Sequence, residues 1–399
     1  MEWKEVTLGE VSSKIGDGLH GTPKYDDEGS YYFINGNNLN CGKIIIKDDT
    51  KRVGIEEFVK NQKELNEQTI LVSINGTIGN VAKYNNEPCI LGKSACYINV
   101  IKEVDKEFIY YILTSANFKR NITNEATGTT IKNVSLKQMR EYKFNIPCNL
   151  ADQRRIASIL SSLDRKIELN NKINADLEEM AQAIFKNWFV DFEPFKDGKF
   201  VDSELGMIPE GWKVGRLGDI TKNKSAKVKE RNDVKVLSPV TTGELVLSEE
   251  YFTKQVFSSS IAKYKIVNKG DFAYNPARVN IGSLGRNEFD FDGCVSPVYV
   301  VFSVLDGYEN YFDLFRKTDF FKDSVASLAI GGVRQSLSYD DLSSIEVIIP
   351  SENAVEEFNN LYNQMKKTIK ANKLESSRLS TLRDTLLPRL MSGEIEVPE

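Results

Sequence analysis

Loop-like stretches in both halves of the sequence are rich in asparagine, threonine, lysine and arginine. Such side chains can hydrogen-bond to the edges of bases, and lysine and arginine also contact phosphates. The candidate DNA-contacting residues are His20, Thr22, Lys24, Asn35, Asn37, Asn75, Thr77, Thr129, Thr130, Lys132, Lys222, Lys224, Lys227, Asn275, Arg278, Asn280, Arg334 and Gln335. Loop asparagines also form turns, so each has a purely structural alternative. His20, in Gly18-Leu-His-Gly-Thr-Pro, could equally contact DNA or hydrogen-bond within a turn.

A basic segment opens the second half of the chain. Between Lys213 and Lys235 there are eight basic residues against three acidic ones. Such a segment suits phosphate contact, which fixes position without reading sequence, and solvated surface is the alternative. The whole chain has a formal net charge of −5, which argues against nucleic acid as its lone partner.

Catalytic and metal-binding motifs are scarce. No glycine-rich cofactor loop follows a strand pattern, and no Gly-x-x-x-x-Gly-Lys-Ser/Thr phosphate loop occurs. Asn275-Pro-Ala-Arg lacks the second proline and the aromatic residue of the Asn-Pro-Pro-aromatic motif of amino-group methyltransferases. One histidine and five irregularly spaced cysteines argue against a zinc site or a disulfide framework. We therefore expect no catalytic residue, metal or cofactor in this chain.

The bulk composition predicts a globular protein of two or three domains. The 399 residues are 41% hydrophobic and 27% charged. No apolar run reaches the ~18 residues of a membrane span. The start, Met1-Glu-Trp-Lys-Glu, lacks the basic and apolar regions of a signal peptide. We expect a cytoplasmic location.

The stretch from Asn149 to Phe192 predicts a long helix packed lengthwise on a partner. Its apolar residues recur in steps of four and three, and a stretch after Pro350 repeats this alternation. The predicted seam residues are Ile156, Leu160, Leu163, Ile167, Asn170, Leu177, Ile184, Phe358, Tyr362, Met365, Ile369, Asn372 and Leu379. About forty helical residues form a rod of about 60 Å. One amphipathic helix on a large core is the alternative, and the seam asparagines could either fix the register or face solvent.

The sequence also repeats itself after about half its length. The matching stretches are Trp3-Lys-Glu-Val-Thr-Leu-Gly with Trp212-Lys-Val-Gly-Arg-Leu-Gly, Ile78-Gly79 with Ile281-Gly282, and residues 128–147 with residues 331–350. Short β-prone runs broken by asparagine and glycine, such as Ile70-Leu-Val-Ser-Ile, fill the mixed part of each half.

This repeat predicts the domain organisation. We expect a mixed unit at 1–148, a helix at 149–192, a linker at 193–210, a second mixed unit at 211–350, a second helix at 351–390 and a tail at 391–399. Equivalent halves tend to adopt a two-fold relation, which makes the two helices antiparallel. The predicted fold class is α+β, with two strand-rich mixed units separated by two long antiparallel coiled-coil helices in a pseudo-two-fold repeat.

Taken together, these features resemble the specificity subunit of type I restriction–modification systems over essentially the whole chain. The stretches that carry the resemblance are Gly18-Leu-His-Gly-Thr-Pro-Lys-Tyr, Leu150-Ala-Asp-Gln-Arg-Arg-Ile-Ala-Ser-Ile-Leu, Leu205-Gly-Met-Ile-Pro-Glu-Gly-Trp and Arg383-Asp-Thr-Leu-Leu-Pro-Arg-Leu-Met-Ser-Gly-Glu-Ile. The start of the second helix departs from this pattern, with Asn353-Ala-Val-Glu-Glu-Phe where the first has Leu150-Ala-Asp-Gln-Arg-Arg.

The resemblance implies that each mixed unit is a target recognition domain that reads half of a split, asymmetric site in double-stranded DNA through the major groove. The helices would set the gap and dock two modification subunits, which carry S-adenosylmethionine and methylate adenine, and restriction subunits could then join. Partner subunits would supply much of the grip on phosphate, which answers the objection from net charge. The main alternative is a protein–protein scaffold with two modules unrelated to DNA, and a self-sufficient methyltransferase is the weaker one.

Overall fold

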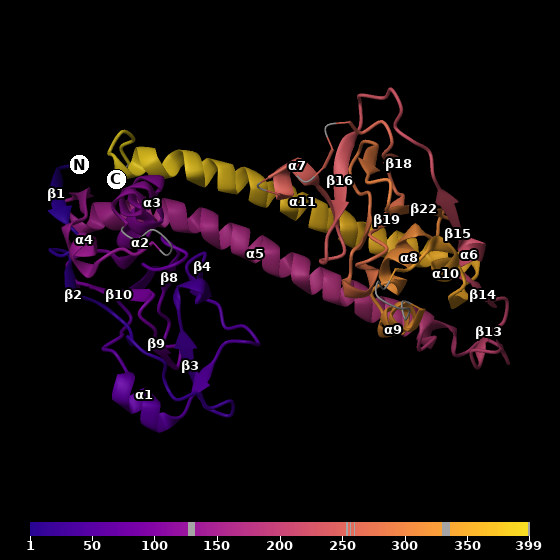
Figure 1. Ribbon diagram of the computed structural model, residues 1–399, viewed down its shortest axis with the longest axis horizontal. Coiled ribbons are helices and arrows are strands. Elements are labelled where there is room, and N and C mark those ends of the chain that lie inside the picture. Colours follow the sequence, from indigo (N-terminus) through magenta and orange to yellow (C-terminus); the bar gives the residue numbers. More distant parts are fainter. Residues whose placement is uncertain (127–131, 253, 256, 259, 329–335, 398–399) are drawn as a thin grey trace. The chain divides into compact units, whose positions relative to one another are not determined.

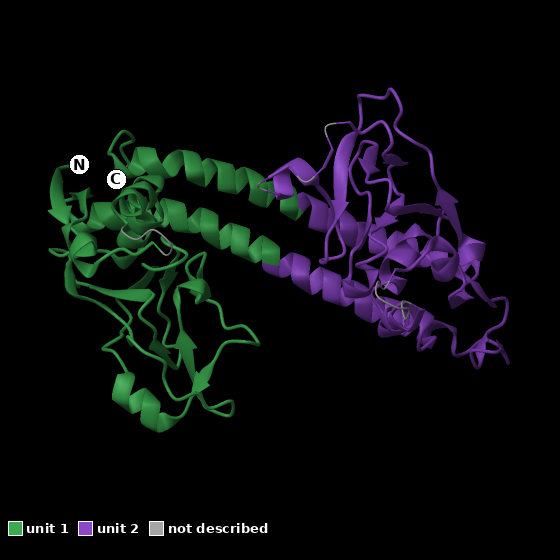
Figure 2. Cartoon of the chain, in the orientation of Figure 1, with its two compact units in different colours: residues 1–171, 372–399 green, residues 172–371 purple. Residues whose placement is uncertain are grey.

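The computed structural model describes residues 1–126, 132–252, 254–255, 257–258, 260–328 and 336–397. The chain forms two compact units, which Figure 2 colours separately. Unit 1 combines residues 1–171 with residues 372–399, and unit 2 is residues 172–371. Both units mix strands with helices, as the predicted α+β class requires.

Unit 1 is built on a four-stranded sheet (Figure 1). Its strand order is β2 (Ser12–Asp17), β10 (Ala95–Val100), β7 (Thr69–Ser73) and β8 (Val81–Lys83). Every residue of β7 and β10 is buried, which fits central strands with continuous apolar runs. The other strands are β6 (Arg52–Val53), β3 (Tyr31–Ile34) and β9 (Cys89–Leu91) in a second sheet, and the pairs β1 (Trp3–Thr7) with β11 (Lys143–Pro147) and β4 (Leu39–Asn40) with β5 (Lys43–Ile44). The short helices are η1 (Gly36–Asn38), α1 (Ile55–Asn61), α2 (Lys106–Thr114), α3 (Ala116–Glu125) and α4 (Leu136–Glu141).

Unit 2 has a corresponding set of elements. Its first sheet has the order β15 (Thr221–Lys224), β22 (Val300–Val304), β19 (Phe272–Tyr274) and β20 (Leu284–Arg286). Its second sheet has the order β17 (Leu245–Leu247), β16 (Lys235–Pro239), β21 (Gly293–Val295) and β18 (Lys265–Val267), and β14 (Lys213–Arg216) pairs with β23 (Glu346–Ile349). The short helices are α6 (Leu217–Ile220), α7 (Ser248–Tyr251), η3 (Val279–Ile281), α8 (Glu309–Phe315), α9 (Asp319–Leu328) and α10 (Tyr339–Ser343). The linker holds η2 (Glu193–Phe195) and the hairpin β12 (Phe200–Val201) with β13 (Ile208–Pro209).

The internal repeat is visible in the strand pairing. Lys4 of β1 lies opposite Ile146 of β11, and Lys213 of β14 lies opposite Ile349 of β23. The second sheet of each unit holds one parallel pair, β3 with β9 in unit 1 and β16 with β21 in unit 2. The repeated sequence therefore folds into a repeated structure with the same register.

Two helices of 40 residues each, α5 (Leu150–Phe189) and α11 (Glu352–Met391), contribute segments to both units. Asn149 precedes α5, and its side chain accepts the backbone N–H of Ala151 at 2.9 Å. This bond caps the start of the helix. Asp152 lies in the first turn, where the helix dipole favours negative charge.

Within unit 1 the two long helices pair in opposite directions. Arg383 Nη1 donates to Asp164 Oδ1 at 2.8 Å, and Asn170 Nδ2 donates to Glu375 Oε2 at 2.8 Å. The residue number on α11 falls as the number on α5 rises, so these segments run antiparallel. This confirms the predicted pairing of the long helices.

The helices also pack on the cores of the units. Ile156 and Leu160 of α5 are fully buried in the same cluster as Leu390 of α11 in unit 1. In unit 2 the rings of Phe189 and Phe358 lie 5.0 Å apart, centroid to centroid. The heptad seam therefore explains the pairing, and the ends of the helices are core helices as well.

Asn170 is a fully buried polar residue in the seam. Its Nδ2 donates to Glu375 Oε2 at 2.8 Å and to Ser376 Oγ at 3.3 Å. Its Oδ1 has no hydrogen-bond partner within the described part of the chain. A buried amide with specific partners across the seam fits the register interpretation and not the solvent-facing one.

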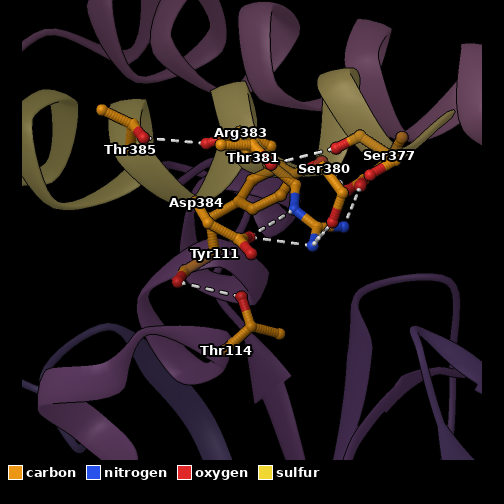
Figure 3. A network of polar contacts seen from close by, with 9 residues as sticks. Tyr111, Thr114, Ser377, Ser380, Thr381, Arg383, Asp384 and Thr385 are labelled. Carbon is orange, nitrogen blue, oxygen red and sulfur yellow. Dashed lines mark hydrogen bonds and ion pairs between the residues drawn. The ribbon is translucent and has the colours of Figure 1, made fainter. Parts of the chain in front are cut away.

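A polar network ties α2 to both long helices in unit 1 (Figure 3). The Tyr111 hydroxyl donates to Asp164 Oδ2 at 2.7 Å, while Arg383 binds Oδ1 of the same carboxylate. Arg383 also donates to Asp384 Oδ1 and to Ser380 Oγ, at 2.8 and 3.2 Å. Burial, together with the bond to Asp164, raises the pKa of Tyr111. Tyr111 therefore remains a donor at neutral pH.

Replacing Tyr111 by Phe removes this hydroxyl and keeps the ring. Because the bond goes to a charged acceptor, we expect the free energy of unfolding to fall by about 1.5–3 kcal/mol. Chemical denaturation measures the change. Tyr110→Phe is the matched control, because Tyr110 is also buried on α2 and no hydrogen bond of its hydroxyl is found among the described residues. Equal losses in both variants would show that the Tyr111 bond contributes nothing.

Candidate nucleic-acid interface

The candidate DNA-contacting loops of unit 1 leave one end of its four-stranded sheet. At this end Asp17 of β2 lies opposite Cys96 of β10, and Ala95 lies opposite Ser73 of β7. The loop after β2, the turn before β10 and the loop after β7 therefore emerge side by side. The unit 1 loop face, as we call it, consists of residues 18–24, 35–38, 74–80, 92–94 and 132–133.

Hydrogen bonds join these loops into one surface. The backbone N–H of Lys93 donates to the carbonyl oxygen of Leu19 at 3.0 Å. Ser94 Oγ donates to Asn35 Oδ1 at 2.9 Å, and the Ile74 N–H donates to the Ser94 carbonyl at 3.0 Å. The loops after β2, β3, β9 and β7 are thus fixed to one another.

The last segment of the face is joined to the β7–β8 loop. Asn75 Nδ2 donates to Asn133 Oδ1 at 3.2 Å, and the Gly76 N–H donates to the Lys132 carbonyl at 3.3 Å. Thr129 and Thr130, which the sequence also predicted as DNA contacts, lie outside the described residues.

The structure distinguishes two kinds of residue among the predicted contacts. The exposed ones are His20, Thr22, Lys24, Asn37, Thr77 and Lys132. Asn35 and Asn75 are half-buried, and their bonds hold the loops in shape. His20 Nε2 lies 2.6 Å from Asp17 Oδ2, and the His20 side chain is 66% exposed. The hydrogen bond that was one of the two alternatives for His20 is therefore present, and its ring is still accessible.

Lys93 is an exposed residue of this face that sequence reasoning missed. It lies in the turn between β9 and β10, in the stretch Gly92-Lys-Ser. A Cβ on Gly92 would lie 2.2 Å from Asn35 Oδ1, so the Asn35 side chain packs directly against this glycine. A Gly-Lys-Ser turn between two apolar β-prone runs was the available signal.

In unit 2 the β19–β20 loop leaves the corresponding end of the sheet. It carries Asn275, Arg278 and Asn280, and Asn275 Oδ1 accepts a backbone N–H two residues ahead at 3.1 Å. Arg278 is exposed, and no side-chain partner of Arg278 is found among the described residues. Gly282 and its repeat equivalent Gly79 have φ of 93° and 86°, so both loops turn back through the same left-handed conformation.

A later segment joins this loop in unit 2, as in unit 1. The Leu337 N–H donates to the Pro276 carbonyl at 3.1 Å, and Leu337 is fully buried. Arg334 and Gln335 precede it and lie outside the described residues. We define the unit 2 loop face as residues 225–234, 240–244, 275–283 and 296–299.

The basic segment contains both exposed basic side chains and basic side chains that form ion pairs within unit 2. Lys222 and Lys227 are exposed. Lys224 Nζ donates to both carboxylate oxygens of Asp271, at 2.6 and 2.9 Å, and Arg231 pairs with two acidic side chains. Burial of Asp271 raises the pKa of its carboxyl in spite of Lys224. Lys222 and Lys227 are therefore better placed for phosphate contact than Lys224.

An ion pair supports the base of the unit 2 loop face. Arg316 donates to Asp313 Oδ1 from Nε and Nη2, at 2.9 and 2.7 Å, and from Nη1 to the Leu284 carbonyl at 2.8 Å. Burial alone would raise the pKa of Asp313, but the charges of Arg316, Lys317 and Lys366 hold it at about 2. Asp313 is therefore ionised at neutral pH, and the pair anchors the start of β20.

None of the described helices is both long enough and apolar enough to cross a membrane. Over the same residues, no group of three or more His, Cys, Asp and Glu side chains is arranged to hold a metal ion. The five cysteines are free.

Gly18→Ala tests how tightly the unit 1 loop face is built. A Cβ at Gly18 would lie 2.0 Å from the carbonyl oxygen of Leu91, which is backbone and cannot move aside cheaply. We expect the free energy of unfolding to fall by about 2 kcal/mol or more. Gly21→Ala is the control, because its Cβ would meet nothing within 4 Å. Denaturation of the two variants gives the comparison, and similar stabilities would contradict the packing of this face.

Comparison with known proteins agrees with this architecture. Residues 1–179 match the family model of the type I restriction modification DNA specificity domain. The type I restriction enzyme MjaIX specificity subunit of Methanocaldococcus jannaschii is 27% identical over 392 residues, which cover 95% of this chain and 87% of that protein. The HindI specificity subunit of Haemophilus influenzae is 26% identical over 374 residues, with 72% and 77% covered.

The fold is also shared with a solved structure. The crystal structure of the type I restriction–modification S subunit from M. genitalium aligns with 100% of this chain and 97% of that chain, with a TM-score of 0.59 and 20% sequence identity. Over residues 1–179 the chain thus matches the type I restriction modification DNA specificity domain, over most of its length it is similar to the specificity subunits of type I restriction enzymes, and it shares the fold of the solved S subunit.

Proposed function

We propose that this chain is the DNA sequence-recognition subunit of a type I restriction–modification complex. Each unit presents its loop face to the major groove of double-stranded DNA and reads one half of a split, asymmetric site. The observation that carries this proposal is the repetition of the loop face. The same sheet end in each unit bears loops of equivalent topology with different exposed side chains, as the reading of two unlike half-sites requires.

The long helices fit the role of a spacer. Each is an uninterrupted helix of 40 residues with segments in both units. Such a helix is about 60 Å long. Half-site separation on DNA is a geometric property of the protein, so a stiff element of fixed length sets the gap without reading the bases inside it.

We assign the chemistry of the complex to other subunits. Two modification subunits, which bind S-adenosylmethionine and methylate adenine, dock along the helices, and restriction subunits join them. The net charge of −5 supports this division, because partners with positive charge would supply much of the phosphate contact. The complex acts in the cytoplasm, where it meets chromosomal and incoming DNA.

An insertion of four residues after Asn170 tests the spacer. It lengthens α5 by about 6 Å, which is close to two base-pair steps of B-DNA. We expect a longer gap in the methylated site with both half-site sequences unchanged. Genome-wide methylation mapping in cells that carry the variant measures the gap and the half-sites together. A companion variant with a matching insertion after Ala371 keeps the two helices equal in length.

The control is a four-residue insertion after Glu204, in the exposed turn between β12 and β13. It adds the same length of chain outside the long helices, so the gap should stay as it is. A helix insertion that alters the half-site bases and leaves the gap unchanged would refute the spacer role.

Arg278→Ala tests reading by unit 2. If Arg278 makes a bidentate contact to a base, its loss should weaken binding by about 1–3 kcal/mol at one half-site only. Arg334→Ala is expected to behave likewise. Binding to duplexes altered in either half-site, at fixed salt, measures the effect. Lys222→Ala is the control for phosphate contact, which weakens binding to every sequence uniformly. A uniform loss with Arg278→Ala would assign that arginine to phosphate.

A further inference from the structure

The unit 2 loop face carries two exposed apolar side chains. Val298 is 72% exposed and Ile281 is 55% exposed. Val298 lies just before β22, and Ile281 lies in the loop that follows β19, its paired neighbour. The unit 1 loop face differs at the corresponding places. Ile78 packs against the core there, and the exposed Lys93 occupies the turn before β10.

A tight turn holds Val298 in place. The backbone N–H of Tyr299 donates to the Ser296 carbonyl at 3.0 Å, which makes Ser296–Tyr299 a four-residue turn. Pro297 occupies its second position, where the fixed φ of proline suits the turn. Val298 is thus presented on a backbone with little freedom to lose on binding.

The β19–β20 loop holds Ile281 in a similar way. The Ile281 N–H donates to the Arg278 carbonyl at 3.2 Å, and Gly282 reverses the chain with φ 93°. Val279, two residues before Ile281, is only 6% exposed and anchors the loop. A preorganised apolar group of this kind contributes to affinity because ordering it costs little.

The chemistry around these residues favours one ligand. Arg278 places a positive charge in the same loop, and Lys227 lies in the segment that follows β15, the strand at the neighbouring edge of the sheet. A protein partner would meet a contiguous apolar core without charges. Here only two large exposed apolar side chains are found among the described residues of the face, and they share it with cations. In the major groove of DNA, the apolar group offered among polar base edges is the C5-methyl of thymine.

We propose that Val298 and Ile281 are specificity-determining residues that contact thymine methyl groups in the half-site read by unit 2. This rests on the proposed function. It makes the two half-sites chemically unlike, since at the equivalent positions of the unit 1 loop face Ile78 packs against the core and Lys93 is charged.

The test uses the full chain assembled with its modification subunits and a duplex that carries the site found by methylation mapping. Each thymine of the two half-sites is replaced in turn by uracil, which lacks only the methyl group. For the unaltered protein we expect about fourfold weaker binding at each contacted thymine, the loss that one buried methyl group predicts. In Val298→Ser and Ile281→Ser, uracil at the corresponding position should cause no further loss.

Leu305→Ser is the matched control. Leu305 is 50% exposed and follows β22, the strand that Val298 precedes, so it lies at the opposite end. This variant should keep the full response to uracil. Thermal unfolding checks that all three variants are folded, as expected for exposed positions.

The alternatives give different results. Normal site-specific binding without any response to uracil would overturn this inference and leave the proposed function standing. A loss in Val298→Ser that is equal on thymine and uracil DNA would also overturn it. If Val298→Ser binds DNA normally but no longer assembles with the modification subunits, Val298 is a protein contact and the inference is overturned. No site-specific binding by the unaltered complex would overturn the proposed function itself.

Discussion

The core of unit 1 is closed by residues from the far end of the chain, and the other features depend on this contact. Leu390 is 2% exposed in the same cluster as Ile156, and a Cβ on Gly393 would lie 2.8 Å from the Trp3 ring. The entropy cost of closing a loop grows only slowly with its length, whereas each large side chain that is buried contributes about 1.5–3 kcal/mol. The pairing of α5 with α11 is therefore secured by the core at the ends of the helices, and the narrow heptad seam is not its sole support.

Local patterns in the sequence predicted much of this fold. Heptad spacing predicted the long helices, and the repeat predicted two equivalent strand-rich units, because both signals can be read from the order of residues alone. The role of Asn170 could not be decided in that way. An asparagine at this spacing can face solvent or lie in the seam, and the difference depends on Glu375 and Ser376, which approach only after the helices pair. Its complete burial decides for the seam.

In the candidate site, too, the sequence predicted the loops but not the contacts that their side chains make in the fold. Asparagine, glycine and threonine between β-prone runs correctly marked loops, and strand order brings these loops to one sheet end. Which side chains are left for a ligand is a tertiary property. Asn35 is bound by Ser94, 59 positions away, and Lys224 by Asp271, 47 positions away. The Gly-Lys-Ser turn marked Lys93 as a loop residue, but its place on this face depends on the backbone bond to Leu19, 74 positions away.

Buried and exposed residues therefore have separate tasks in each unit. Pairs such as Asp313 with Arg316 fix the strands and the bases of the loops, and changing them alters stability. Exposed positions such as Thr77 and Val298 can vary without disturbing that frame, because little of the packing depends on them. In this way a protein with a repeated fold can recognise a DNA site whose two halves differ. Under the proposed function, the repeated backbone sets where a base is read, and the unlike side chains at equivalent loop positions set which base it is.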